Sequence, residues 1–144
     1  MNRIEKRLEE LKQEFKKYNI DIISGIEFNT SISNLHLLGY AVKNFKLVDE
    51  VMQNLRIKNE RVCLEVIELL KKDGFVISET LIKKYLQEMN LDYSILDKRK
   101  LVKYLMYMGY TNSIVETYET LIGKKQKYYV PNVKLSPEEI INLI

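Results

Sequence analysis

Histidine and cysteine, the residues most often used for catalysis and metal binding, are almost absent from this sequence. Its 144 residues include one histidine, one cysteine, two prolines and no tryptophan. A single cysteine excludes an internal disulfide framework and is typical of a reducing compartment. No apolar run approaches the about 18 residues that a membrane helix needs, and the charged stretch MNRIEKRLEELKQ is unlike a signal peptide. These absences predict a cytoplasmic protein with no membrane partner.

The charge balance and the missing motifs exclude further classes of protein. There are 23 Lys and Arg residues against 20 Asp and Glu, and a net charge of +3 is too small to indicate nucleic-acid binding by electrostatics alone. Neither a GxGxxG nor a GxxxxGK[ST] motif occurs, which removes two common nucleotide-binding explanations. What is present, 46% apolar and 30% charged residues, is typical of one globular domain with its own core.

The remaining pattern predicts a mostly helical chain. Apolar residues at alternating spacings of three and four indicate amphipathic helices over 2–18 and 47–73, and Gly74 ends the second. Cys63 lies among apolar positions of that second helix, so we expect a buried structural thiol rather than a nucleophile.

Capping residues predict shorter helices in the second half of the chain. They are 79–89 after Ser78, 98–108 after Asp97, and one reaching about residue 121 after Asn112 or Ser113. The final stretch LSPEEIINLI has Ser136 at the cap, Pro137 at the first helical position and Glu139 three residues after the cap. This arrangement is a capping box with proline in its preferred place.

One β-hairpin is predicted near the N-terminus. DIISGIEF and LHLLGYAV read as strands, and NTSISN between them supplies turn residues. If the turn centres on Ser31 and Ile32, paired residue numbers add up to 63 and Glu27 faces His36. Facing residues have Cβ atoms about 4.5–5.5 Å apart, which allows a carboxylate and an imidazole to approach one metal ion or two neighbouring ions. A shift of the centre by one residue pairs Glu27 with Leu38 instead.

Without further information this hairpin has two interpretations. His36 is either an ordinary partly buried histidine beside a surface acid, or part of a metal site with Glu27. A lone two-stranded hairpin is marginally stable by itself, so the sequence leaves this segment short of a complete sheet.

At this point several motifs carry a resemblance to a known family. The chain from about residue 10 to its end resembles the polymerase-and-histidinol-phosphatase (PHP) family, in particular its bacterial phosphoesterases with a helical insertion. The matching stretches, in family order, are GIEF and LHLLGY, NLRIKNERVCLEVIELLKKDGF, the MGY of KRKLVKYLMYMGY, GKKQKYYVP and LSPEEIINLI. Each motif alone has low specificity, and their common order makes the resemblance more specific.

The resemblance implies a helix-dominated α/β fold. Part of a distorted (β/α)7 barrel, one helix and the hairpin, would occupy residues 1–45. A helical insertion subdomain would follow over 46–122, and 123–144 would be a return segment that begins a barrel helix.

The resemblance also implies a chemistry. Family members hydrolyse phosphate esters at a multinuclear metal centre, where the ions activate water and offset developing charge. Glu27 and His36 would be metal ligands, with His36 neutral, and manganese, iron or zinc suits such donors. The implied partner is a phosphorylated small molecule or an oligonucleotide.

The departures from the family pattern matter equally. With one histidine, the chain cannot contain the family's HxH, DH, HP and DxH motifs. We therefore expect an internal fragment with little activity by itself, and both a homo-oligomer and a complementing barrel fragment stay open as partners. The alternative from another class is a non-catalytic helical interaction module with a decayed metal site.

A second departure concerns Lys98, Arg99 and Lys100. Relatives often have Arg-Pro-His or Arg-Ala-His at this place, implicated in binding substrate phosphate. In this sequence the basic triplet follows Asp97, so it lies in the first turn of a helix, where free backbone N–H groups favour anions. A weak phosphate site and a solvated basic face are both open here.

Overall fold

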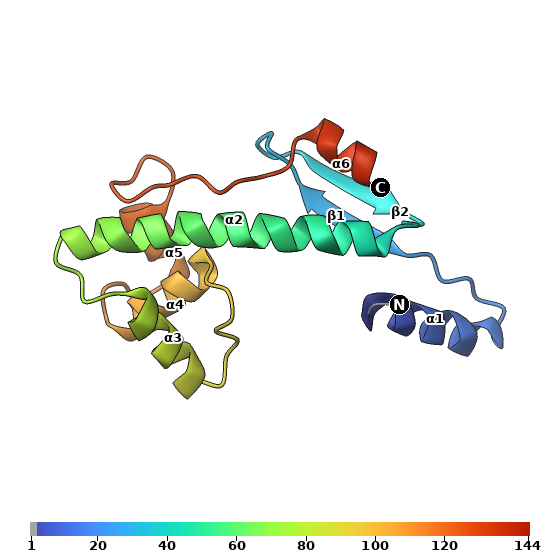
Figure 1. The fold of residues 1–144 in the computed structure, drawn as a ribbon, viewed down its shortest axis with the longest axis horizontal. Helices are drawn as coiled ribbons and strands as arrows, with labels where there is room; N and C mark the ends of the chain where they lie inside the picture. Colours follow the sequence, from blue (N-terminus) through green and yellow to red (C-terminus); the bar gives the residue numbers. More distant parts are fainter. Residues whose placement is uncertain (1–2) are drawn as a thin grey trace. The chain divides into compact units, whose positions relative to one another are not determined.

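The computed structural model describes residues 3–144, which form two compact units. Of the described residues, the first unit comprises 3–54 and 134–144, and the second comprises 55–133. The residues described form six α-helices, a π-helical turn and one two-stranded sheet (Figure 1). None of the helices in this part of the chain has the length and apolar character needed to cross a membrane.

The predicted hairpin is present in the first unit, with a different register. Strand β1 (Gly25–Asn29) pairs antiparallel with β2 (His36–Tyr40), and the numbers of paired residues add up to 65 because Gly25 lies opposite Tyr40. The expectation that Glu27 faces His36 is wrong. Glu27 lies opposite Leu38, the arrangement that follows from shifting the turn by one residue.

The loop between the strands explains this register. The Thr30 N–H donates to the Leu35 carbonyl, so the residues between them, 31–34, form the loop in place of a two-residue turn. The Thr30 hydroxyl accepts from the Ile32 N–H at 3.1 Å and donates to the Leu35 carbonyl at 2.9 Å. Asn34 adopts a positive φ of 62°, which asparagine tolerates better than most residues. Side-chain chemistry at Thr30 therefore sets the strand pairing.

One face of the hairpin is buried against helices of the same unit. Phe28 packs with Val48 from the start of α2 (Phe45–Lys72) and with Ile140 from α6 (Pro137–Leu143), which lies beside the sheet (Figure 1). The predicted capping box of α6 at Ser136 is confirmed. A Cβ at Gly39 would be 3.1 Å from the Ile144 side chain, so the end of the chain fits closely against β2.

Two further segments complete the first unit. Helix α1 (Arg3–Lys16) confirms the predicted N-terminal helix, while the expected start at residue 2 lies outside the described residues. Beyond β1, Thr30 forms an isolated parallel bridge with Leu135, and the Ser31 N–H donates to the Leu135 carbonyl at 2.8 Å. The chain that returns to this unit therefore begins to pair with the sheet beside β1.

The second unit is a helical body with its own core. It contains most of α2, then α3 (Glu79–Glu88), α4 (Lys98–Tyr107) and α5 (Ile114–Thr117). The predicted caps Ser78 and Asp97 each accept a backbone N–H, and of the two alternatives for the third helix the cap is Ser113. Its fully buried side chains include Cys63, Val66, Leu70, Ile82, Leu86, Leu101, Leu105 and Ile122. Cys63 is a buried free thiol, as predicted, and burial raises its pKa to about 12.

A π-helical turn, η1 (Tyr118–Ile122), follows α5 where the sequence predicted continued α-helix. The Gly123 N–H donates to the Tyr118 carbonyl at 2.8 Å, five residues back. A Cβ at position 123 would be only 2.1 Å from the same oxygen. Glycine is therefore required at this position by the close approach of two backbone segments.

Side-chain hydrogen bonds hold two non-helical segments of the second unit, one at Val133 and one at Val76. The Asn59 amide donates to the Val133 carbonyl at 3.0 Å and accepts from the Val133 N–H at 2.8 Å. After α2, the Val76 N–H donates to the Tyr110 hydroxyl at 2.8 Å, and the Val76 carbonyl accepts from the Tyr104 hydroxyl at 3.0 Å. Tyr104 of α4 and Tyr110, which follows that helix, thus bind both backbone groups of the exposed Val76.

We predict that Tyr104→Phe and Tyr110→Phe each lower the free energy of unfolding by about 0.5–1.5 kcal/mol, because each loses one hydrogen bond and keeps its ring. Urea denaturation would measure the change. Tyr107→Phe is the matched control and should change stability by less, because Tyr107 is exposed and its ring centre lies 4.6 Å from that of the Tyr85 ring. Equal losses in all three variants would contradict a specific role for Val76.

Candidate functional site

The two predicted metal ligands lie together on the exposed face of the hairpin. The Nδ1 atom of His36 is 2.6 Å from Oε1 of Glu27. His36 lies opposite Asn29 and Glu27 opposite Leu38, so the pair spans a diagonal of the sheet. Diagonal neighbours are within reach of long side chains, which explains a close contact despite the shifted register.

This face of the sheet is open. The His36 and Glu27 side chains are 50% and 60% exposed. Leu38 and Tyr40, which point to the same face by alternation, are also largely exposed. A cleft of about 540 Å³ in the same unit lies between α1 and the segments flanking the hairpin, lined in part by Leu8, Val42 and Phe45, and it does not include the Glu27–His36 pair. The pair therefore lies on an uncovered surface.

The donor types of this pair fit a divalent metal ion, but the number of donors falls short. Imidazole nitrogen and carboxylate oxygen are common ligands for zinc, iron and manganese. Within residues 3–144, however, no group of three or more His, Cys, Asp or Glu side chains is arranged to hold an ion. The pair could supply part of a metal centre.

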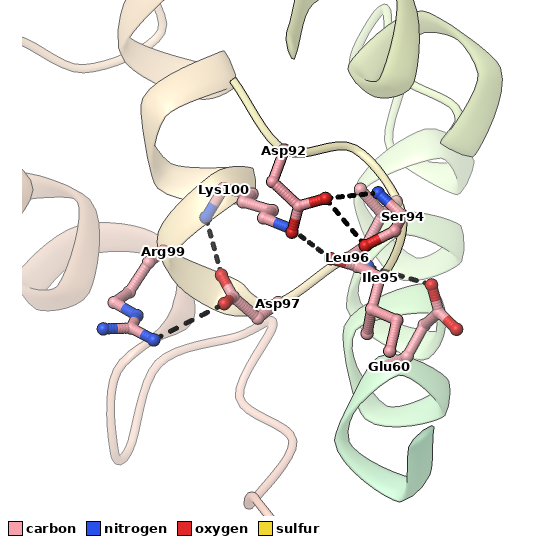
Figure 2. A network of polar contacts seen from close by, with 8 residues as sticks. All are labelled: Glu60, Asp92, Ser94, Ile95, Leu96, Asp97, Arg99 and Lys100. Atoms are coloured by element: carbon pink, nitrogen blue, oxygen red, sulfur yellow. Dashed lines mark hydrogen bonds and ion pairs between the residues drawn. The ribbon is translucent and has the colours of Figure 1, made fainter. Parts of the chain in front are cut away.

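Two members of the basic triplet, Arg99 and Lys100, make contacts with acidic side chains of the second unit (Figure 2). The Lys100 ammonium contacts Oδ2 of Asp92 at 3.0 Å and donates to the Ile95 carbonyl, and its side chain is only 17% exposed. Arg99 is 87% exposed and its guanidinium lies 3.7 Å from Oδ2 of Asp97. The three side chains therefore do not converge on one place, and phosphate binding by them stays a prediction.

Lys98 is the most buried member of the triplet. Its ammonium donates to the Val130 carbonyl and lies 5.6 Å from the centre of the Tyr129 ring. Burial lowers the pKa of Lys98 below its usual range. This lysine holds the 128–130 segment against the start of α4.

Sequence reasoning missed the acidic residues that organise this region. Asp92 accepts from the N–H and the hydroxyl of Ser94, at 3.0 and 2.7 Å, and Glu60 accepts from the Leu96 N–H at 2.9 Å (Figure 2). The Ser94 hydrogen bonds and the Lys100 ammonium hold the pKa of the Asp92 carboxyl well below its usual range. The Asp-x-Ser spacing is a signal for a local Asx turn, whereas the contact of Glu60 from α2 had no sequence signal.

Comparison with known proteins finds a solved structure whose fold is similar to that of this chain. No protein-family model and no curated protein matches the chain. A crystal structure from Bifidobacterium adolescentis ATCC 15703, described as a "putative metal-dependent phosphoesterase", matches with a TM-score of 0.66 and 17% identity. The match covers 94% of this chain and 47% of that one, so this chain spans about half the length of its structural neighbour. At this identity the likeness establishes the fold: a helix-dominated α/β fold like part of that protein.

We predict that Lys100→Ala destabilises the chain by about 1 kcal/mol, because it removes charge-assisted hydrogen bonds that tie α4 to the preceding loop. Arg99→Ala, at the neighbouring exposed position, should stay within about 0.5 kcal/mol of the parent. Thermal unfolding of both variants would measure the difference. A larger loss for Arg99→Ala than for Lys100→Ala would contradict this assignment.

We predict that acid removes the contribution of the Asp92 carboxylate to the stability of the folded chain. Because its folded pKa lies below the ordinary value of 3.8, the stabilisation is present above that pH and is lost as the pH falls toward the folded pKa. Asp92→Asn should therefore have a lower melting temperature than the parent at about pH 6, and the gap should narrow toward about pH 2. Asp21→Asn, at an exposed carboxyl of the first unit, is the control. A gap that is constant with pH would contradict the role of the Asp92 charge.

Proposed function

We propose that this chain is part of a PHP-family metal-dependent phosphoesterase, in which Glu27 and His36 contribute to the metal centre. The observation that carries the proposal is the 2.6 Å contact between the only histidine and Glu27, in the GIE and LHLLGY motifs through which the chain resembles that family. The fold likeness to a protein described as a metal-dependent phosphoesterase supports it independently.

The chemistry proposed for the complete centre is the hydrolysis of a phosphate ester. Bound divalent ions would lower the pKa of a water molecule and offset charge on the phosphoryl oxygens. This chain's part is to present an imidazole and a carboxylate on the open face of the sheet, held from behind by the packing of Phe28. Manganese, iron and zinc are all compatible with these donors.

The substrate class and the partners follow from the family resemblance. We propose a nucleotide or an oligonucleotide as substrate, and a complementing barrel fragment or a second copy as the source of further ligands. Lys98, Arg99 and Lys100 are proposed as a weak phosphate-binding group, for which the exposed Arg99 is the best placed. The assignment of 1–45 and 123–144 to barrel segments, and of 46–122 to the insertion, belongs to the same proposal.

A second function is favoured by one observation, the shortage of ligands. Because no group of three metal-binding side chains occurs among the described residues, a non-catalytic helical interaction module with a decayed metal site is the alternative. It predicts no bound metal at Glu27 and His36 and a stable oligomer that covers the open hairpin. Metal analysis combined with light scattering would separate the two.

We predict that the purified 144-residue chain hydrolyses a phosphomonoester and a short RNA at rates close to background in the presence of Mn²⁺, because two donors hold a catalytic ion poorly. Robust turnover that both Glu27→Ala and His36→Ala abolish would show a complete centre and contradict this expectation. The DNA on either side of the coding region tests family membership, since HxH and DH codons should lie upstream and HP and DxH codons downstream. Their absence would favour the interaction module.

A further inference from the structure

We propose that helix α1 is a self-association surface, through which two copies of this chain pair as an antiparallel coiled coil. The inference goes beyond the proposed metal centre and does not depend on it. It concerns the face of α1 that carries Leu8, Leu11 and Phe15, which we call the α1 stripe.

The α1 stripe is only partly covered by its own chain. Among the described side chains of α1, residues 5–16, none is fully buried and none belongs to either hydrophobic core. Tyr18, which continues the same spacing just after the helix, is 64% exposed. The cleft of about 540 Å³ beside the stripe is lined in part by Leu8, Val42 and Phe45. The described part of the chain therefore leaves room for a partner along α1.

The spacing of apolar residues along α1 is that of a coiled coil. In the sequence, Ile4, Leu8, Leu11 and Phe15 follow one another at intervals of four, three and four residues. This is the a/d pattern of a heptad repeat, with Leu8 and Phe15 at a positions and Leu11 at a d position. The similar stripe of α2 is buried in the two cores, whereas that of α1 is not.

The charged residues beside the stripe identify the partner as a second copy of the same helix. Glu5 and Lys12 take the e positions, and Arg7 and Glu14 take the g positions. An antiparallel coiled coil brings e positions beside e positions and g positions beside g positions. When the numbers of facing core residues add up to 19, Glu5 of one copy lies beside Lys12 of the other, and Arg7 lies beside Glu14. The two-fold symmetry repeats both contacts, so all four pairs join opposite charges.

The same charges disfavour a parallel pair. A parallel coiled coil brings each g position beside the e position five residues further along the other copy, which places Arg7 beside Lys12. Arg7, Lys12 and Glu14 each form an ion pair with a nearby residue of their own chain, and these pairs are solvent-exposed. Exposed pairs contribute little, so they can exchange partners at small cost. The charges therefore select the orientation, and the apolar stripe provides the affinity.

The size of α1 predicts a weak dimer. Its 14 residues span about 21 Å, or two heptads, which is less than the interface of a stable dimer usually provides. The full chain should therefore show a monomer–dimer equilibrium in sedimentation equilibrium between micromolar and millimolar concentration. Leu11→Asp should abolish the dimer, because it places a charge in the seam. Leu38→Asp, on the open face of the hairpin, is the matched control and should leave the dimer unchanged.

Charge exchange tests the orientation and keeps the apolar stripe intact. Lys12→Glu should weaken dimerisation by about tenfold, because two opposite-charge pairs become like-charge pairs. Glu5→Lys should do the same, and an equimolar mixture of the two variants should recover the parent affinity as a heterodimer. Lys6→Glu makes the same charge change at an f position away from the seam and should have little effect. Far-UV circular dichroism would show whether each variant keeps its helices.

Three results would overturn the proposal. One is a parent chain that stays monomeric up to millimolar concentration. Another is a dimer that Leu38→Asp dissociates and Leu11→Asp does not, which would place the interface on the hairpin. A third is tighter dimerisation of Lys12→Glu, which a parallel pair predicts because Arg7 would then face a glutamate. If Leu11→Asp lowers the helix content, the charge variants alone decide. None of these measurements involves a metal ion or turnover, so the proposed function is tested separately.

Discussion

Burial of the apolar stripe of α2 is the constraint on which the rest of the structure depends. Val48 near its start enters the core of the first unit, and Cys63, Val66 and Leu70 enter the core of the second with no exposed surface. Each fully buried aliphatic side chain of this size contributes about 1.5–3 kcal/mol relative to an exposed one. Most helical stability in proteins comes from such packing rather than from propensity, so the two buried stretches of this 28-residue helix stabilise it.

The same burial positions the candidate site. Successive residues of a strand point to opposite faces, so Phe28 can be buried against α2 and α6 only if Glu27 faces outward. The open face of the hairpin therefore carries the Glu27–His36 pair because of what lies on its other face. The packing of Phe28 fixes the orientation of β1, and that orientation places Glu27 on the open face beside His36.

Local features of the fold were predictable from sequence, and non-local ones were less so. The caps Ser78, Asp97 and Ser136 satisfy backbone N–H groups within three residues, so their chemistry is visible in a short stretch of sequence. The hairpin register was wrong because it depends on Thr30 and a four-residue loop, 31–34, rather than on the strand pattern. The proximity of Glu27 and His36 survived that error because a diagonal pair also brings long side chains into contact.

The basic triplet shows a second limit of prediction from sequence, which concerns the partners of charged side chains. A sequence gives the charges of Lys98, Arg99 and Lys100 but not the groups that meet them, and here the Val130 carbonyl and Asp92 come from other segments. Of the three, the structure leaves one guanidinium largely in solvent. A charge run is therefore informative about function only after its internal partners are known.

The π-helical turn before Gly123 constrains the length of the chain as well as its composition. Its backbone hydrogen bonds span one residue more than those of an α-helix, so it holds one residue beyond what regular winding would need. Deleting a single residue from Tyr118–Ile122 would remove this wide turn and the hydrogen bond from the Gly123 N–H to the Tyr118 carbonyl. Related chains that keep this turn should therefore tolerate exchanges within it more readily than insertions or deletions.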